Sequence, residues 1–432
     1  MSCCDTAASA GICTSPRNAA CSLVSSWLWT LTANGGYALT QWLLVVCLAR
    51  MGSAVVVGYY SWALAVTTPV VMLSNLSLRV VLTGDSQRIR PFRLYLRLRI
   101  ISTSLATVPL LGAAIMTWAD TAQAGMLIAV GATKCVEAIS DIYYGLYQRD
   151  LRADRLARSI AVKSMLGFGA FASVLALTSS SLMAFCGLIL VHVAAIVFFD
   201  VPYGGSSGRD HGKACGGARD IWTLAVGAGP LGVVWMLNSV AGNAPRYLLE
   251  HYVGPGELGV FTAVFNVGLL SSLVCLALGE TSIPRFASLY QRGDVRRFMH
   301  LLACVGALPI VLGVVFGLCA HLVGGDILTV VYGRDYASYN VLLTGTVVAF
   351  VTCNIAIFVS CALYATGEYG AFVPNYLINT GLVLLGSWLC VKHAHLVGGA
   401  LSVGVIGMGS IAVAAVTLFP RLRARLINAQ RR

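Results

Sequence analysis

Residues 123–148 read QAGMLIAVGATKCVEAISDIYYGLYQ, a stretch long and apolar enough to cross a membrane that nevertheless carries five strongly polar residues. These are Lys134, Glu137, Asp141, Tyr144 and Gln148, at successive spacings of three, four, three and four. A helix turns by about 100° per residue, so all five side chains fall on one face. A charge near the bilayer centre costs at least about 2.5 kcal/mol unless it faces a protein interior or a wet cavity. The stretch therefore predicts a polar cavity enclosed within a membrane.

The composition places most of the chain in a membrane. Of its 432 residues, 58% are hydrophobic and 11% are charged, whereas a soluble protein carries roughly 25% charged residues. The sequence therefore predicts an all-α integral membrane protein with twelve transmembrane helices. The twelve apolar segments lie at residues 23–49, 55–78, 98–118, 125–147, 159–177, 182–201, 221–240, 258–278, 298–321, 341–364, 372–391 and 397–419.

A polar, glycine-rich connector follows the sixth segment and divides the chain into two parts. This connector, at residues 202–219, separates a six-helix half at 21–201 from a second one at 220–420. Because six is even, both halves enter the membrane from the same side, and we expect two parallel halves around a central cavity. The remaining residues are predicted to form a disordered cytoplasmic tail at 1–20 and a basic cytoplasmic tail at 421–432.

Short glycine-containing motifs recur at corresponding places in the two halves. Gly58-Tyr59-Tyr60, after the first segment, is echoed by Gly259-Val260-Phe261 after the seventh. Helix breakers also lie within these two segments, as Asn34-Gly35-Gly36 and as GAGPLG at residues 227–232. Interrupted helices at matching positions of two halves are typical of transporter substrate sites. Asn34 is therefore a candidate cavity residue.

The net charge of +12 is distributed unevenly between the two sides of the predicted membrane. Only Arg50, Arg246, Arg334 and Lys392 fall on the side opposite the N-terminus. This asymmetry places both termini in the cytoplasm and makes the basic loops contacts for anionic lipids rather than for nucleic acid. The loops on the N-terminal side carry six basic residues at 79–99, four at 149–158, three at 209–219, four at 285–297 and five at 421–432.

The fourteen cysteines do not suggest a disulfide framework. They lie either in apolar segments, where a free thiol behaves as a small hydrophobe, or on the cytoplasmic side, where thiols stay reduced. Cys3, Cys4 and Cys13 lack the spacing of a metal site. No nucleotide-binding or hydrolase motif is present. The sequence therefore predicts a secondary transporter without a metal or cofactor rather than an enzyme.

The polar stripe has three interpretations. Lys134 lies one turn from Glu137 and two turns from Asp141, so an internal ion pair can form. Glu137 and Asp141 repel each other when both are ionised, which makes either a candidate for H⁺ or Na⁺ coupling. The same residues are also candidates for substrate contact, or for a structural network that joins helices.

Several polar residues outside the stripe are further candidates for the cavity wall. Arg246 suits a phosphate by its bidentate geometry, although pairing with Glu250 one turn away is an alternative. Lys163 and Arg79 are candidates to extend a basic path inward from the cytoplasm, as a lipid diphosphate would need. Positive-inside topology is the alternative for both and is favoured for Arg79. His192, alone on an apolar segment, is predicted to be a packing residue. The other candidates are Asn238, Asn243 and Asn266.

The order of these motifs resembles a known family of membrane proteins. The chain is similar to polysaccharide flippases, which move O-antigen or capsule repeat units and belong to the multidrug/oligosaccharidyl-lipid/polysaccharide (MOP) exporter superfamily. The resemblance covers about residues 20–365, and the last two segments match in hydropathy only. It rests on Leu48-Ala-Arg-Met-Gly52, Gly58-Tyr59-Tyr60, Thr83-Gly-Asp85, the stripe from Lys134 to Gln148, Asn243-Ala-Pro-Arg-Tyr247, Gly259-Val-Phe261, and Leu328-x-x-x-Tyr332-Gly-Arg-x-Tyr336.

The resemblance implies a translocase in a bacterial inner membrane. Its substrate would be an undecaprenyl-diphosphate-linked oligosaccharide, moved from the cytoplasmic to the outer leaflet. The protein would be a monomer, and a polysaccharide polymerase and a chain-length regulator would be its partners. Two alternatives stay open: a multidrug or cation antiporter of the same superfamily, and a membrane-embedded polymerase or glycosyltransferase. The second would need a large outer loop, which the sequence lacks, and a peptidoglycan-precursor flippase would typically have fourteen segments.

Overall fold

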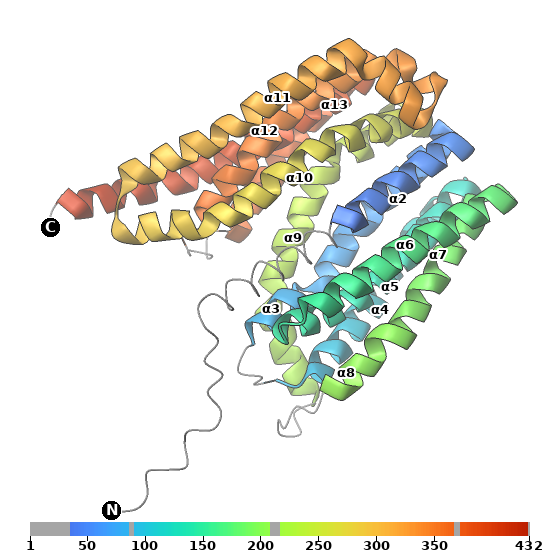
Figure 1. The fold of residues 1–432 in the computed structure, drawn as a ribbon, viewed down its shortest axis with the longest axis horizontal. Coiled ribbons are helices and arrows are strands. Elements are labelled where there is room, and N and C mark those ends of the chain that lie inside the picture. The colour runs from blue at the N-terminus through green and yellow to red at the C-terminus, as the bar shows by residue number, and fades with distance from the viewer. Residues whose placement is uncertain (1–34, 86–89, 208–216, 367–371, 431–432) are drawn as a thin grey trace, which may run out of the picture.

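A computed structural model describes residues 35–85, 90–207, 217–366 and 372–430, and its regular elements are all helical (Figure 1). The first described helix covers residues 35–51. The others are α2 (Ala54–Asn75), α3 (Leu78–Gly84), α4 (Phe92–Met116), α5 (Thr121–Arg149), α6 (Ala153–Thr178), α7 (Ser181–Ala195), the π-helical turn η1 (Ile196–Asp200), α8 (Val201–Ser207), α9 (Ala218–Tyr252), α10 (Pro255–Arg292), α11 (Val295–Tyr332), the 3₁₀ helix η2 (Arg334–Tyr339), α12 (Asn340–Tyr364) and α13 (Phe372–Gln430).

This is a multi-pass membrane protein, as predicted. Within the described ranges, nine helices are long and apolar enough to cross a bilayer. The helix α5 is not among them, because its polar stripe lowers its hydropathy. The helix α13 is two helices joined at His395, whose backbone (φ 47°, ψ −121°) is not helical, and these match the last two predicted segments. The count of twelve stays a prediction because the first segment begins outside the described residues.

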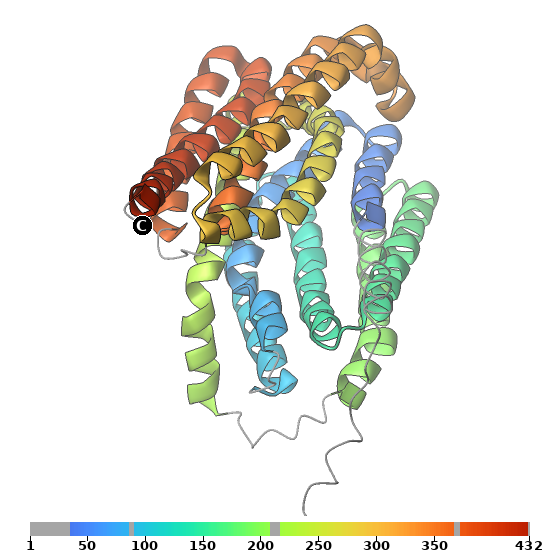
Figure 2. The same cartoon turned by 60° about the vertical axis from the view of Figure 1, so that its left-hand side comes forward.

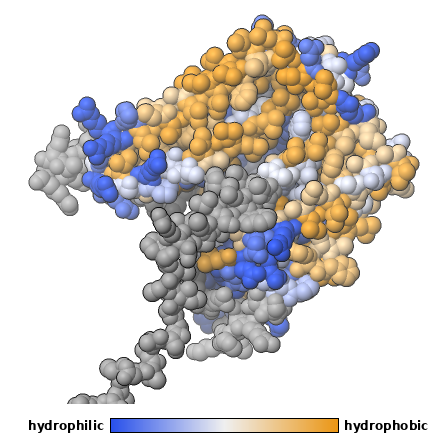
Figure 3. Space-filling view, viewed as in Figure 1, coloured by the Kyte–Doolittle hydropathy of each residue, from blue (hydrophilic) through white to orange (hydrophobic). Residues whose placement is uncertain are grey.

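The helices form two bundles joined by α9 (Figures 1 and 2). The first contains α2 to α8 and the second α10 to α13, while α9 packs against both α2 and α13. Apolar residues cover much of the visible outer surface of both bundles, and polar residues gather at their ends (Figure 3). Exposed Leu105 and Ile115 on α4, and Val314 and Leu318 on α11, belong to this surface, as expected for helices in lipid.

The two bundles touch most closely where α2 crosses α10. A Cβ atom on Gly58 would overlap the backbone of Pro255, and one on Gly259 would overlap the backbone of Ala54. Only glycine allows such an approach, which is how small residues promote helix packing in membranes. The two glycine motifs that echo each other in the sequence thus also meet in a physical contact between α2 and α10.

A sharp turn between α2 and α3 directs the chain toward α5. Leu76 and Ser77 both have positive φ angles (47° and 49°), which non-glycine residues adopt only under local constraint. The helix α3 then lies against Gly145 of α5, where a Cβ atom would press on the backbone of Arg79 at 3.3 Å. The sequence predicted one segment through residue 78, and the turn is what brings Arg79 inward.

The predicted interruption of the seventh segment is not observed. The helix α9 continues through Pro230 and Pro245 without a break. Gly232 instead provides close packing, because a Cβ atom there would lie 3.1 Å from the carbonyl oxygen of Leu73. Gly232 therefore serves helix contact, whereas a Cβ atom on Gly227 or Gly229 would meet nothing within 4 Å.

Candidate substrate cavity in the first bundle

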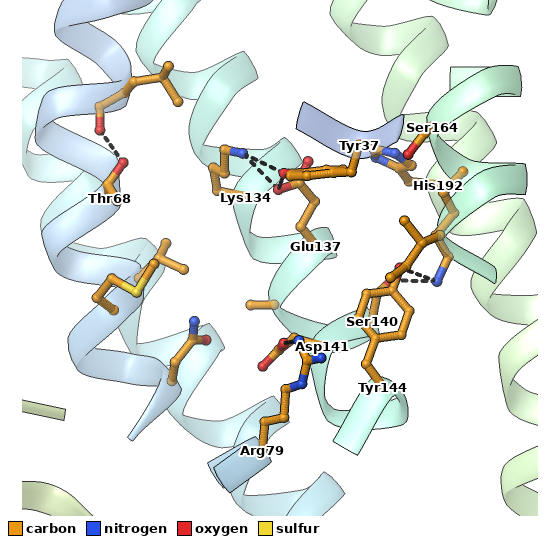
Figure 4. A pocket seen from close by; sticks show the side chains of 17 residues that line it. Tyr37, Thr68, Arg79, Lys134, Glu137, Ser140, Asp141, Tyr144, Ser164 and His192 are labelled. Carbon is orange, nitrogen blue, oxygen red and sulfur yellow. Dashed lines mark hydrogen bonds and ion pairs between the residues drawn. The ribbon is translucent and has the colours of Figure 1, made fainter. Parts of the chain in front are cut away.

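A cavity of about 360 Å³ lies within the first bundle. Its wall comes from the helix at 35–51 and from α2, α3, α5, α6 and α7 (Figure 4). Four of the five stripe residues, Lys134, Glu137, Asp141 and Tyr144, line it side by side along α5. The regular α-helical geometry of α5 produces this arrangement. Asp120 is the N-cap of this helix, and its side chain accepts hydrogen bonds from the first backbone N–H groups.

Lys134 and Glu137 form an ion pair at one end of the stripe. Lys134 Nζ lies 2.7 Å from Glu137 Oε2, as their spacing predicted. The hydroxyl of Tyr37 donates to the same oxygen at 3.1 Å, and Lys134 Nζ lies 3.4 Å from that hydroxyl. The other carboxylate oxygen, Oε1, is buried without a hydrogen-bond partner in the described structure. We call Lys134, Glu137 and Tyr37 the Glu137 group.

Asp141 is held by two arginines and not by Lys134. Arg79 Nη1 lies 3.0 Å from Asp141 Oδ1, and Arg99 Nη2 lies 3.1 Å from Oδ2. Arg99 is fully buried and also donates to Asn75, whereas about 30% of the Arg79 side chain is exposed. Arg79 Nε donates to Gln148 at 3.0 Å, so Gln148 orients this arginine. We call Asp141, Arg79 and Arg99 the Asp141 group.

Both arginines were counted in the basic connector at residues 79–99, and the structure places both in helices, as segment 98–118 predicted for Arg99. Arg79 begins the first turn of α3, and Arg99 lies a third of the way along α4. The positive-inside pattern cannot separate an arginine in a loop from one just inside a helix, because it counts both. Their position in helices against α5 makes them part of the cavity network.

Lys163 belongs to a third charged group, in which its partner is a carboxylate that the sequence analysis did not predict. It forms an ion pair with Asp200 and donates to Ser140 Oγ at 3.0 Å and to the Tyr144 hydroxyl at 3.3 Å. Asp200 is fully buried and also accepts hydrogen bonds, at 2.8 Å each, from Tyr147 and Ser159. We call Lys163 and Asp200 the Asp200 group.

The local backbone explains how Asp200 reaches Lys163. It ends the π-helical turn η1, which adds a residue to the turn and rotates the side chains that follow. The apolar run before it read as the end of a membrane segment, so an inward-facing acid was not expected. The only available signal was a carboxylate directly after Phe198-Phe199.

The three groups together carry a small positive excess. Each contains one carboxylate, but the Asp141 group contains two arginines, so four cations face three carboxylates. The excess cation that reaches the cavity is Arg79, since Arg99 is fully buried. A cavity of this kind is suited to an anionic ligand.

The remaining predicted residues lie in other places. Asn34 lies outside the described residues. Asn238 lines a second cavity, in the second bundle, and Asn266 lines neither. Asn243 donates to the carbonyl of Ser239 at 2.8 Å and accepts from Arg246 at 2.6 Å.

The geometry decides one alternative for these residues, the pairing of Arg246. Arg246 stacks over the ring of Phe265 at 5.1 Å, while Glu250 accepts a hydrogen bond from Gln123 at 2.9 Å. The suggested pair between Arg246 and Glu250 is therefore not formed. His192 lines the first cavity and packs beside Gly167, and its Nδ1 atom is buried without a hydrogen-bond partner in the described structure. Its assignment as a packing residue stays a prediction.

The described cysteines and acids form neither cross-links nor a metal cluster. Nine cysteines have described positions, and all nine are free thiols. Cys3, Cys4, Cys13, Cys21 and Cys215 lie outside those positions. Among the residues described, no three of His, Cys, Asp and Glu gather as metal ligands would.

Comparison with known proteins supports the resemblance seen in the motifs. No family model matches the sequence. The chain is 23% identical over 390 residues to the capsular polysaccharide biosynthesis protein CapF of Staphylococcus aureus, covering 89% of this chain and 96% of CapF.

Solved structures with similar folds are transporters and flippases rather than enzymes. An inward-facing multidrug resistance transporter of the MATE family, within the MOP superfamily, aligns with a TM-score of 0.74 at 13% identity, covering 91% of this chain and 96% of that one. The lipid II flippase MurJ, in an inward closed conformation, aligns with a TM-score of 0.68 at 10% identity, covering 93% and 91%. The chain therefore has the fold of the MOP exporter superfamily, as the order of its motifs predicted.

Proposed function

We propose that this protein is a flippase for an undecaprenyl-diphosphate-linked oligosaccharide, used in making an O-antigen, a capsule or an exopolysaccharide. The observation that carries the proposal is the excess positive charge of the first cavity, which is exposed through Arg79. A diphosphate is a strong ligand for an arginine because its oxygens accept two parallel hydrogen bonds. The similarity to CapF supports a role in polysaccharide synthesis.

A multidrug or cation antiporter shares this fold but needs different cavity chemistry. A cationic substrate would be repelled by a wall in which cations outnumber carboxylates, and each carboxylate here already has a cationic partner. The charge balance therefore favours an anionic substrate over a cationic drug.

Coupling to an ion gradient belongs to this proposal. Glu137 and Asp141 are the candidates for H⁺ or Na⁺ coupling. Glu137 is the stronger one, because its Oε1 atom has no partner in the described structure, whereas both oxygens of Asp141 are paired. No cofactor is proposed.

We propose a place in the bacterial cytoplasmic membrane, with both termini inside. The two halves, 21–201 and 220–420, would move around a central cavity, and the crossing of α2 and α10 would close its outer end. A monomer acts on its lipid-linked substrate beside anionic lipids, and a polymerase and a chain-length regulator act on the product.

Reporters fused at Gly216 and at Pro255 should then report opposite sides of the membrane. The same side at both positions would rule out this arrangement.

Deleting the gene tests the function directly. We expect cells without it to lose the surface polysaccharide and to accumulate the lipid-linked repeat unit in the cytoplasmic leaflet. Both defects should disappear when the wild-type gene returns. Measured drug resistance should stay unchanged. Normal polysaccharide display combined with increased drug sensitivity would instead identify an antiporter.

A further inference from the structure

The second bundle contains a cavity with a different chemistry from the first. It measures about 490 Å³ and lies among α9, α10, α12 and α13. Among its described lining residues, Glu280 is the sole acid and no Lys, Arg or His is present. Its lining includes amide side chains, such as those of Asn375 and Asn379, and aromatic side chains, such as those of Tyr376 and Trp235. This cavity is therefore not a second site for a diphosphate.

Two amides on α13 have unused hydrogen-bonding atoms at this cavity. Asn379 is only 4% exposed; its Nδ2 donates to Ser410 at 3.3 Å, and its Oδ1 has no partner. One helical turn earlier, Nδ2 of Asn375 is buried without a partner. A buried polar atom without a partner costs about 1–3 kcal/mol, so each needs a ligand or water to bind. Both residues line the cavity, and each carries one amide atom, an acceptor on Asn379 and a donor on Asn375, that no group of the described structure satisfies.

This combination matches the hydroxyl groups of a sugar. A hydroxyl both donates and accepts, so it can satisfy a free amide N–H and a free amide oxygen together. The ring of a sugar also has an apolar C–H face, which packs against aromatic side chains such as Trp235 and Tyr376. A cation would need acceptor atoms alone, whereas Glu280 is the sole charged acceptor among the described lining residues and the unsatisfied atom of Asn375 is a donor. The donor therefore favours a saccharide over a metal ion.

We propose that the second cavity is a saccharide subsite, in which Asn375 and Asn379 bind hydroxyl groups of the oligosaccharide. This inference rests on the proposed flippase function and divides the substrate between the two bundles. The diphosphate lies near Arg79 in the first cavity, and the sugars reach the second. Recognition of the sugar then depends on α13, whereas recognition of the lipid diphosphate does not.

Binding to purified protein in lipid nanodiscs tests this division with two probes. The first probe is the free saccharide released by mild acid from the lipid-linked repeat units of cells that make this protein. The second is undecaprenyl diphosphate without sugar. We expect Asn379→Leu and Asn375→Leu each to weaken saccharide binding about tenfold and to leave undecaprenyl diphosphate binding unchanged. Arg79→Ala should show the opposite pattern.

A matched control is Asn266→Leu, which changes a half-buried asparagine of α10 that lines neither cavity. Thermal unfolding of each variant checks folding, and Asn379→Leu loses only one 3.3 Å hydrogen bond. The subsite is overturned when Asn379→Leu and Asn375→Leu bind the saccharide as the wild type does, or when the wild type does not bind it. It is also overturned when ²²Na⁺ binds the wild type and is lost in Glu280→Gln, with no saccharide binding.

Failure of the subsite and failure of the flippase proposal give different results. When undecaprenyl diphosphate binding depends on Arg79 but saccharide binding ignores α13, only the subsite is wrong. When the wild-type protein binds neither probe and gene deletion leaves polysaccharide display normal, the flippase function itself is wrong.

Discussion

A disulfide between cysteines placed at Ser61 and Thr262 should stop transport almost completely. The two hydroxyl oxygens lie 2.6 Å apart, one on α2 and the other on α10, and both residues are buried. A cysteine Sγ takes the place of each oxygen, and 2.6 Å is close to the length of about 2.05 Å of an S–S bond. When the two halves must part here for the cavity to open on the other side, a covalent link prevents the change. Polysaccharide display would be measured in cells whose protein lacks its native cysteines, before and after oxidation.

The matched control links two helices within one bundle. Ser272 and Asn354 lie on α10 and α12, with their side-chain oxygens 2.6 Å apart, so cysteines there should cross-link without joining the halves. Transport should survive oxidation in this control and return to the Ser61→Cys, Thr262→Cys protein after reduction. Full transport by that protein, with its cross-link verified on a gel, would mean that α2 and α10 stay together throughout the cycle.

The contact between α2 and α10, on which this prediction depends, could be predicted only in part from the sequence. The echo between Gly58 and Gly259 suggested a repeated element, because a similar glycine-containing motif follows the first and the seventh segments. That the two copies would touch each other depends on how the halves dock. A local sequence pattern does not predict how the halves dock. The role of the two glycines follows only from the structure, in which Gly58 lies against the backbone of Pro255 and Gly259 against that of Ala54.

The candidate site divides in the same way. The stripe on α5 was predictable because one regular helix fixes where its own side chains point. Its partners were not, since they come from four other elements. Asp141 pairs with Arg79 and Arg99, both of which were counted among the basic residues of a connector. Lys163 pairs with Asp200, which a π-helical turn rotates inward. Helical periodicity predicts neither the contacts between different helices nor the direction of side chains that follow an irregular turn.

The ion-pair partners of Arg79 and Lys134 predict different roles for these two residues, substrate binding for Arg79 and structural support for Lys134. Removing Arg79 leaves Asp141 paired with Arg99, so folding should be preserved. Removing Lys134 leaves the Glu137 carboxylate unpaired in the membrane, which costs about 3–5 kcal/mol when a buried ion pair is broken. Arg79→Ala should therefore act on transport, and Lys134→Ala on the amount of folded protein.

We expect Arg79→Ala to lower transport by about 10- to 100-fold at normal abundance, because one charged hydrogen-bonding group to the diphosphate is worth about 1.5–3 kcal/mol. Surface polysaccharide and the amount of protein in the membrane would be measured together. Arg79→Lys should keep part of the activity, since it keeps the charge but loses the bidentate geometry. Full transport by Arg79→Ala would remove the Asp141 group from substrate binding.

Lys134 gives the complementary result. Lys134→Ala should reduce abundance, Lys134→Arg should keep it, and Lys134→Ala combined with Glu137→Gln should recover it, because the neutral amide can still accept the hydrogen bond of Tyr37. Lys392→Ala is the control, since that lysine stacks on Trp388 of α13 and lines neither cavity. When the double variant is abundant and also active, Lys134 neutralises Glu137. When it is abundant but inactive, either Lys134 contacts the substrate or Glu137 couples the ion. Glu137→Gln alone distinguishes these when its transport is divided by its abundance, which the unpaired Lys134 should also lower. Only an ion-coupling role makes the protein that remains inactive.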